Sequence, residues 1–253
     1  MKIDLSNKTA LITGATGQLG RVMVRTLAEC GANIIIHYHN NIEKAKELYS
    51  EIEKIGRRAF IVQADITDFN SIIQMKEKIT SEFTLPDIIV DNAVIQYRWT
   101  TVLEQAAEDY ESQFKSCVMQ NVYMAKAFVQ PMIEKNTGRF IGINTECSMM
   151  NFPTQSAYVA AKRGMDGVMR ILAKEIGEYN ITVNQVAPGW TISDNDRQWG
   201  TEYSKEYCEK VPLKRRGTDQ EIANVVAFLA SDLASFITGA YIPVCGGNVM
   251  PTI

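Results

Sequence analysis

The chain has 253 residues, of which 46% are hydrophobic and 22% charged, enough for the buried core of one large α/β domain. Its 29 acidic and 26 basic residues give a net charge of −3, which argues against a nucleic-acid or anionic-membrane partner, because either would favour a basic surface. No apolar run reaches the roughly 18 residues of a membrane span, and the short polar start leaves no room for a signal peptide.

The cysteines and histidines narrow the class of protein further. The five cysteines are odd in number and form no CxxC motif, which predicts a reducing compartment and hence a cytoplasmic protein. The two histidines, His37 and His39, belong to no cluster with the spacing of zinc ligands, so we expect no metal site.

Short β-branched segments alternate with amphipathic segments along the chain. The predicted strands are residues 9–13, 33–37, 59–63, 88–90, 140–143, 182–186 and 241–244. The predicted helices are residues 21–30, 43–55, 71–83, 110–135, 158–179 and 219–231. Gly31 and Gly56 follow the first two helices and are expected to end them.

This alternation predicts an α/β fold of the Rossmann type, a doubly wound parallel sheet of about seven strands with helices on both faces. No linker or repeat interrupts the pattern, so residues 1–253 are expected to form a single domain. Ligands of such sheets bind outside the carboxyl ends of the strands, where we therefore look for the functional side chains.

The first predicted strand ends in the sequence TGATGQLG at residues 13–20, and a helix follows. Glycines in a strand-to-helix turn let the backbone approach a phosphate closely, and the helix start offers free N–H groups and the positive end of a dipole. The alternative is a tight turn without a ligand. The candidate cofactor-binding residues here are Gly14, Thr16, Gly17, Gln18, Leu19 and Gly20.

The end of the second strand carries a second cofactor signal. Proteins that prefer NAD usually have an acid there to bind the ribose 2′-hydroxyl, whereas this sequence has Tyr38, His39 and Asn40. A 2′-phosphate would be tolerated, and His39 or Asn40 can hydrogen-bond it, so the sequence favours NADP over NAD. The alternative is that His37 and His39 are solvated loop residues.

Tyr158 and Lys162 are four residues apart in a predicted helix and therefore share one face. A phenol with a pKa near ~10 is a poor acid–base group at neutral pH, but a neighbouring ammonium lowers that pKa. Such a pair can pass a proton to or from a carbonyl or alcohol oxygen while a hydride moves at a nicotinamide. The spacing alone also arises by chance.

Further motifs accompany this pair. Taken together, these motifs make the chain resemble the short-chain dehydrogenases/reductases of the compact, single-domain branch over essentially its whole length. Thr145 follows a strand thirteen residues before Tyr158, and Asn121 lies in the long preceding helix. The segments that carry the resemblance are residues 13–20, 64–66, 91–94, 120–122, 138–141, 158–162, 183–189, 228–232 and 237–239.

The resemblance implies roles for the catalytic candidates. Tyr158 would be the general acid/base, and Lys162 would lower its pKa and bind the nicotinamide ribose. Thr145 stands where the family usually has serine and would hydrogen-bond the substrate oxygen. Asn121 would hold a water molecule that extends a proton relay to Lys162.

The resemblance also assigns the remaining cofactor contacts. Asp65 would bond the adenine amino group with Ile66 packed nearby, and the hydroxyls of Thr191 and Ser193 would bind the carboxamide. The other residues expected to line the cofactor cleft are Asn92, Ala93, Val94, Pro188 and Gly189.

The sequence departs from the family pattern at several positions. Gln18 replaces the usual middle glycine of the turn, and Gly17 lies one residue early. Residues 91–94 read Asp-Asn-Ala-Val where the family usually has Asn-Asn-Ala-Gly, which adds bulk beside the nicotinamide. Cys245 replaces a common aspartate and is expected to be structural.

Glu146 follows Thr145 where a small or apolar residue is usual. Its carboxylate can bind a polar substrate or shift local pKa values; the alternatives are that it points to solvent or pairs with Arg98 or Arg139.

The substrate side is expected to include a lid over residues 190–212, rich in aromatic and polar side chains that suit a polar or ring-shaped substrate. An ordinary pair of exposed helices is the alternative. The candidate substrate-binding residues are Gln96, Thr145, Glu146, Gln155 and Trp190, with Trp99 bordering the same cleft.

We therefore expect an NAD(P)-dependent oxidoreductase that acts on a carbonyl or secondary alcohol of a small, polar substrate. A 3-oxoacyl-thioester reductase is the alternative within the family, and a non-catalytic NAD(P)-binding sensor or scaffold is the alternative of another class. The family resemblance also implies a homo-oligomer, a tetramer or a dimer.

Overall fold

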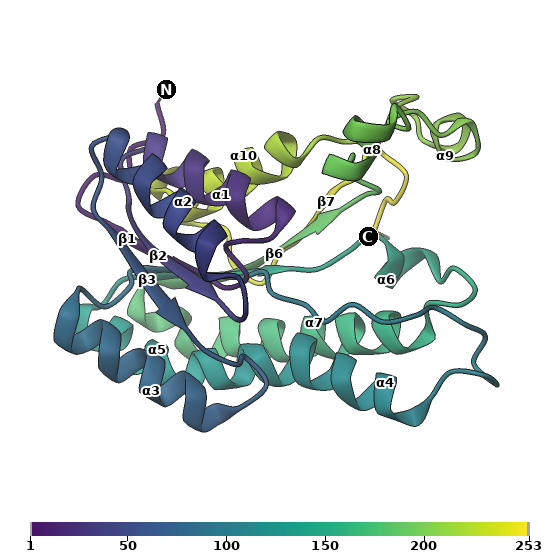
Figure 1. The fold of residues 1–253 in the computed structure, drawn as a ribbon. Helices are drawn as coiled ribbons and strands as arrows, with labels where there is room; N and C mark the ends of the chain where they lie inside the picture. Colours follow the sequence, from purple (N-terminus) through teal and green to yellow (C-terminus); the bar gives the residue numbers. More distant parts are fainter. Residues whose placement is uncertain (1, 252–253) are drawn as a thin grey trace.

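The computed structural model describes residues 2–251. Its seven strands form one parallel sheet in the order β3-β2-β1-β4-β5-β6-β7 (Figure 1). The strands are β1 (Thr9–Ile12), β2 (Asn33–Tyr38), β3 (Ala59–Gln63), β4 (Ile88–Asp91), β5 (Gly138–Ile143), β6 (Ile181–Pro188) and β7 (Tyr241–Val244). The predicted doubly wound sheet and its seven strands are confirmed.

Helices cover both faces of the sheet (Figure 1). One face carries α1 (Gln18–Glu29), α2 (Ile42–Lys54) and α10 (Asp219–Ala230). The other carries α3 (Phe69–Glu82), α5 (Gln120–Lys135) and α7 (Ser156–Ile176), with α4 (Ala107–Gln113) continuing the layer. Gly31 and Gly56 follow α1 and α2 with positive φ angles, as expected for glycines that end a helix.

Alternate residues of each central strand enter two separate apolar cores. In β4, Ile88 and Val90 pack against α1 and α10, whereas Ile89 packs against α5 and α7. A strand buried on both faces needs apolar residues at successive positions, which is why these strands read as continuous β-branched runs.

The strand order reverses between β1 and β4, and the loops that follow these two strands diverge to opposite faces of the sheet. This divergence opens a crevice at the carboxyl edge of the strands, the usual ligand site of doubly wound sheets.

The predicted single helix over residues 110–135 is wrong in detail. It is broken into α4, a π-helical turn (Phe114–Met119) and α5. The wider turn displaces the backbone ladder by one residue, and the Asn121 side chain then donates to the Cys117 carbonyl at 2.6 Å. Such an insertion leaves no mark in hydrophobic periodicity.

Three short helices lie outside the predicted ones: α6 (Cys147–Met150), α8 (Asp194–Trp199) and α9 (Lys205–Lys210), of which α8 and α9 form the helix pair that was the alternative for residues 190–212. Each is shorter than two turns, too short for a periodic pattern to show. In the described part of the chain, no helix is long and apolar enough to cross a membrane.

Candidate active site

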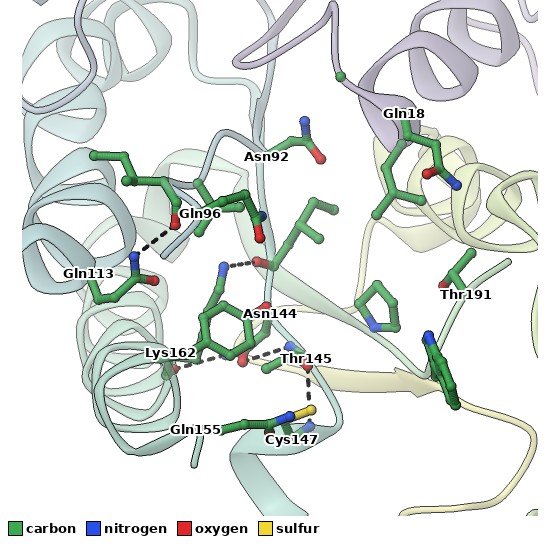
Figure 2. Close-up of a pocket in the computed structure, with 18 of the residues that line it drawn as sticks. Gln18, Asn92, Gln96, Gln113, Asn144, Thr145, Cys147, Gln155, Lys162 and Thr191 are labelled. Carbon is green, nitrogen blue, oxygen red and sulfur yellow. Dashed lines mark hydrogen bonds between the residues drawn. The ribbon is translucent and has the colours of Figure 1, made fainter. Parts of the chain in front are cut away.

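A cavity of about 1310 Å³ opens at the carboxyl edge of the sheet, over β1, β4, β5 and β6 (Figure 2). It runs from the loop after β2 to the segment 190–212 and brings together most of the side chains predicted from the sequence. The predicted residues that line it are Gly14, Thr16, Gly17, Gln18, Leu19, His39, Asn40, Asp65, Ile66, Asn92, Ala93, Val94, Gln96, Thr145, Glu146, Gln155, Tyr158, Lys162, Pro188, Gly189, Trp190 and Thr191.

Four predicted site residues do not line this cavity. Gly20 lies beneath the glycine turn, and Tyr38 packs on the apolar core between the sheet and α1. The Ser193 hydroxyl is engaged with Asp196 in the capping box that starts α8. Asn121 is buried, and its side chain donates to the Cys117 carbonyl.

The glycine turn fits a dinucleotide pyrophosphate. Gly14 has a φ of +62°, and a Cβ on Gly20 would overlap the carbonyl oxygen of Gly14, so both positions require glycine. Gly17 is the N-cap of α1 and offers no side-chain cap, so the first N–H groups of the helix remain free for an anion.

His37 is not a solvated loop residue, which corrects the alternative prediction. Its ring is buried, with Nδ1 accepting from the Gly14 N–H at 3.0 Å and Nε2 3.1 Å from the Ala64 carbonyl. Burial lowers the pKa of His37 to about 4, so the ring is neutral and bridges the glycine turn to the end of β3. His39 is exposed and lines the cavity.

A network of hydrogen bonds joins the glycine turn to the end of β4. The Thr13 hydroxyl accepts from the Asn92 and Ala93 N–H groups and donates to Gln120 Oε1 at 2.8 Å. The Asn92 side chain donates to the Thr13 and Gly14 carbonyls. Asn92 therefore shapes the turn with its side chain, a role that the sequence analysis did not assign.

Tyr158, Lys162 and Thr145 line the cavity together, and Figure 2 shows Lys162 and Thr145 at one side of it. Lys162 Nζ lies 5.8 Å from the centre of the Tyr158 ring and donates to the Ile143 carbonyl at 2.5 Å. The Thr145 hydroxyl accepts from the Cys147 N–H at 3.2 Å, and a hydrogen bond from the same side chain favours the charged form of Tyr158.

The Tyr158 pKa departs from the expected direction. Burial raises the pKa of Tyr158 above its usual value, and the side chain of Thr145 opposes this shift. The Lys162 ammonium is directed at the Ile143 carbonyl rather than the phenol oxygen. The structure thus assembles the pair but does not itself lower the phenol pKa.

Asn144 holds this wall in place, and the sequence analysis missed it. Its side chain donates to the Lys162 carbonyl at 3.1 Å and to Gln185 Oε1 at 2.7 Å, and accepts from the Thr145 N–H. Its place directly before Thr145, at the end of a buried strand, was the available signal.

Glu146 neither points to solvent nor pairs with Arg98 or Arg139. Its buried carboxylate accepts from the Tyr207 hydroxyl at 2.8 Å, the Trp190 N–H at 3.2 Å and Asn248 Nδ2 at 3.0 Å. Burial raises the pKa of Glu146, and these three donors oppose the shift.

Those partners make Glu146 the anchor of the segment predicted as a lid. It ties Trp190 and Tyr207 to the strand end that carries Thr145, and Asn248 joins from the chain's last turn. The cavity wall contributed by this segment includes Trp190, Thr191 and Tyr207.

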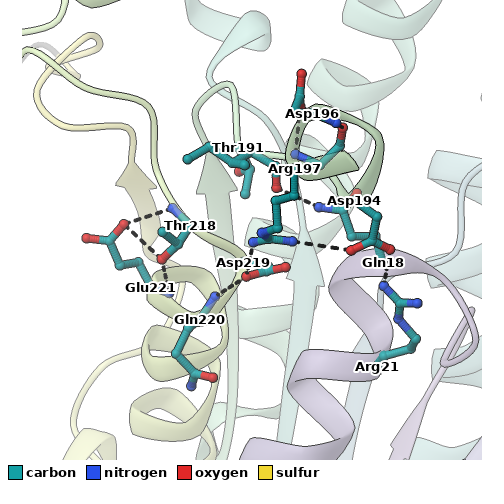
Figure 3. Close-up of polar contacts among 12 residues, drawn as sticks. Gln18, Arg21, Thr191, Asp194, Asp196, Arg197, Thr218, Asp219, Gln220 and Glu221 are labelled. Carbon is teal, nitrogen blue, oxygen red and sulfur yellow. Dashed lines mark hydrogen bonds and ion pairs between the residues drawn. The ribbon is translucent and has the colours of Figure 1, made fainter. Parts of the chain in front are cut away.

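Polar contacts also link residues 190–212 to the two helices α1 and α10 (Figure 3). Gln18 Nε2 donates to the Ile192 carbonyl at 2.7 Å, so the residue that replaces the usual turn glycine reaches across the cleft. Arg21 pairs with Asp194, and Arg197 pairs with Asp219 at 2.8 Å. The segment is thus linked to both α1 and α10.

Two buried amide oxygens in the part of the cavity where the substrate is expected have no hydrogen-bond partner in the described part of the chain. They are Oε1 of Gln113 and Oε1 of Gln155. Gln113 donates from Nε2 to the Ile95 carbonyl at 2.8 Å, and Gln155 extends beside Cys147 (Figure 2). Gln113 was not predicted; it is the last residue of α4, directly before the π-helical turn.

Among the described residues, no group of three or more His, Cys, Asp or Glu side chains is arranged to hold a metal ion, and the five cysteines are not paired. The doubly wound sheet, the glycine turn and the tyrosine–lysine wall define the class of protein, an oxidoreductase dependent on a nicotinamide dinucleotide.

Comparison with known proteins places the chain within that class. A family model described as Enoyl-(Acyl carrier protein) reductase matches residues 14–248. The 3-oxoacyl-(acyl-carrier-protein) reductase FabG of Staphylococcus epidermidis is 35% identical over 245 residues, covering 96% of this chain and 100% of that protein. The FabG protein of Chlamydia trachomatis is 32% identical over 243 residues, covering 96% and 98%.

The fold agrees with solved structures. A gluconate 5-dehydrogenase from Burkholderia cenocepacia, solved with NADP and tartrate, has a TM-score of 0.90 and 27% identity, covering 98% of this chain and 97% of its own. The chain belongs to the short-chain dehydrogenase/reductase family, as its motifs predicted, and is an oxidoreductase acting on carbonyl or alcohol groups.

Proposed function

We propose that the protein uses NADP to reduce a carbonyl group, or oxidise the matching alcohol, on a small polar substrate, with Tyr158 as general acid/base. The observation that carries this proposal is the meeting of Tyr158, Lys162 and Thr145 on one wall of a cavity whose far end is the glycine turn. When bound, the dinucleotide supplies or accepts the hydride at the substrate carbon.

The chain's own residues would handle the substrate oxygen. Thr145 donates a hydrogen bond from its hydroxyl to that oxygen, and Tyr158 transfers a proton to it during reduction or removes one during oxidation. Lys162 supplies the positive charge beside the phenol. Asn121 is buried with Oδ1 unpartnered in the described structure, so this oxygen is free to hold the water molecule that would extend a proton relay.

Two features favour NADP over NAD. The loop after β2 places His39 and Asn40 at the cavity, where no acid would repel a 2′-phosphate. A related solved structure contains NADP. Asp65 lies beyond this loop at the same end, where it would reach the adenine.

A polar substrate is favoured by the unpartnered oxygens of Gln113 and Gln155. A buried acceptor without a donor costs free energy, about 1–3 kcal/mol, which a hydroxyl group of the substrate would recover. A keto-sugar or keto-polyol supplies such hydroxyls near its carbonyl, whereas an acyl chain does not.

We infer a cytoplasmic enzyme and, from the family, a homo-oligomer.

A 3-oxoacyl-thioester reductase is the second candidate, because the FabG proteins are 32–35% identical over nearly the whole chain. Steady-state rates with NADPH, measured on keto-polyols and on short 3-oxoacyl thioesters, separate the two. We expect a higher kcat/KM on the keto-polyols, which Gln155→Leu lowers about tenfold or more. Faster thioester reduction, unaffected by Gln155→Leu, would favour the second candidate.

The alternative from another class of protein is a non-catalytic NAD(P)-binding sensor or scaffold. It would bind NADPH, seen as a change in its fluorescence, and would oxidise it with no carbonyl compound. Turnover on any member of the panel that is lost in Tyr158→Phe rules this alternative out.

A further inference from the structure

Asp91, the last residue of β4, is a buried acid to which the mechanism above gives no role. Its side chain is 2% exposed, and neither carboxylate oxygen has a hydrogen-bond partner in the described part of the chain. Burial raises the pKa of Asp91 well above its usual range. An asparagine, the usual residue of the family at this position, would avoid the cost of burying a charge.

The sheet geometry places Asp91 on the catalytic side. Ile89 packs against α5 and α7, so Asp91, two residues further along the strand, points to the same face. Gly142 is its register partner on β5. A Cβ on Gly142 would lie 3.4 Å from Asn121 Oδ1, so the carboxyl lies in the neighbourhood of another unpartnered buried oxygen.

Lys162 supplies the charge in this neighbourhood. Its Nζ donates to the carbonyl of Ile143, the residue after Gly142, and lies 3.9 Å from Met165 Sδ. Lys162 is also the charged group whose attraction opposes the rise in the Asp91 pKa. Asp91, Asn121 and Lys162 are therefore three buried polar residues on the α5 and α7 side of the sheet, and α7 also carries Tyr158.

We propose that Asp91 is a positioning residue that sets how much of the Lys162 charge acts on Tyr158. As a neutral acid, Asp91 leaves the ammonium uncompensated beside the phenol. Once ionised, Asp91 compensates the ammonium and weakens its effect on the phenol. This proposal rests on the proposed roles of Tyr158 and Lys162, and it makes Asp91 a built-in limit on activity at alkaline pH.

The first test is stability, which needs no substrate. The folded-state pKa of Asp91 is raised above the unfolded value near ~3.9, so the wild type loses stability as pH rises from that value toward the raised one. Asp91→Asn removes this loss. Its advantage in Tm over the wild type should grow with pH, by about 3 °C per pH unit until Asp91 ionises in the folded protein.

A double-mutant cycle tests the coupling to Lys162. In a Lys162→Met background the ammonium no longer stabilises the ionised carboxylate, so the Tm advantage of Asp91→Asn should be larger at alkaline pH, where Asp91 ionises in the folded wild type. Asp87→Asn is the matched control, because Asp87 precedes the same strand but is paired with Lys135 and the Thr9 N–H. It should show no stabilisation that grows with pH.

The second test is the pH dependence of kcat/KM for alcohol oxidation. Asp91→Asn should remain active at alkaline pH where the wild type declines, while Asp87→Asn follows the wild type. An Asp91→Asn protein that is less stable at every pH, an advantage at alkaline pH that is equal in both backgrounds, or superimposable pH profiles would each overturn the proposal. A wild type that turns over no carbonyl would refute the proposed function instead, and the stability cycle would still decide whether Asp91 and Lys162 are coupled.

Discussion

The two ends of the cavity are built by different means. At the cofactor end, backbone groups of the glycine turn face the cavity, and His37, Thr13 and Asn92 hold that turn in shape. At the substrate end, side chains from segments far apart in sequence meet, among them Gln113 and Glu146. A substitution that adds atoms beside the glycine turn should therefore disrupt the turn. A substitution at the substrate end can be accommodated in space but removes specific contacts.

Substitution of Lys162 should impair both ends of the cavity, the binding of the cofactor and the catalysis at the substrate end. It carries the positive charge beside Tyr158 and, by family resemblance, binds the nicotinamide ribose. Lys162→Met keeps the length of the side chain and removes its charge. We expect kcat/KM to fall about 10³-fold, together with weaker NADPH binding, measured by steady-state kinetics and fluorescence titration. Unchanged NADPH affinity would confine Lys162 to the substrate end.

Gly20→Ala tests the backbone end alone. The new Cβ would overlap the Gly14 carbonyl, so the turn must open and NADPH affinity should fall about tenfold or more. Gly167→Ala is the control, because a Cβ there meets nothing within 4 Å and alanine favours a helix by up to about 1 kcal/mol. Equal NADPH affinity in both variants would contradict the assignment of the turn.

Glu146 tests the side-chain end. Glu146→Ala removes the acceptor for Tyr207, Trp190 and Asn248, and should cost about 2 kcal/mol of unfolding free energy and raise the substrate KM. Glu146→Gln keeps one acceptor oxygen and removes a buried charge. It should stay within about 1 kcal/mol of the wild type in chemical denaturation. A loss equal to that of Glu146→Ala would mean that the similar shape and single acceptor oxygen of glutamine do not suffice and that the carboxylate itself is needed.

The cofactor preference should respond to His39, at the boundary of the backbone end. His39→Asp places a carboxylate where a 2′-phosphate would lie and where a 2′-hydroxyl could be accepted. We expect the ratio of NADPH to NADH affinity to fall about tenfold. An unchanged ratio would show that the phosphate lies elsewhere or that the protein uses NAD.

The contacts across the cleft should have the smallest effect. The Arg21–Asp194 pair is partly exposed to solvent, and such pairs contribute about 0–1 kcal/mol. Arg21→Ala should change Tm little and speed NADPH release only a few-fold, an effect that weakens further in high salt. A larger change in stopped-flow release would make this pair a principal fastening of the segment 190–212.

The same contrast explains what the sequence could predict. The sheet, its strands and the glycine turn follow from local patterns of apolar residues and glycines, so they could be located within a residue or two. Tyr158, Lys162 and Thr145 were found because their spacing matches a family motif, and the cavity does bring them together.

The substrate end resisted prediction for physical reasons. Gln113 lines the cavity from the end of α4, next to a π-helical turn that the sequence did not reveal. Glu146 is held by Tyr207 and Asn248, which are 61 and 102 residues away in sequence. Asp91 was noticed only as a departure from a motif. Its lack of partners depends on the burial of β4, which no local pattern reveals.

The most direct test of the account compares NADPH binding with single-turnover hydride transfer in the wild type and Tyr158→Phe. The phenyl ring keeps the wall of the cavity and removes the proton donor, so NADPH should bind with the same affinity while NADPH oxidation by the best carbonyl substrate slows at least about 100-fold. Rapid oxidation in Tyr158→Phe, with NADPH affinity unchanged, would contradict the assignment of Tyr158 as the general acid.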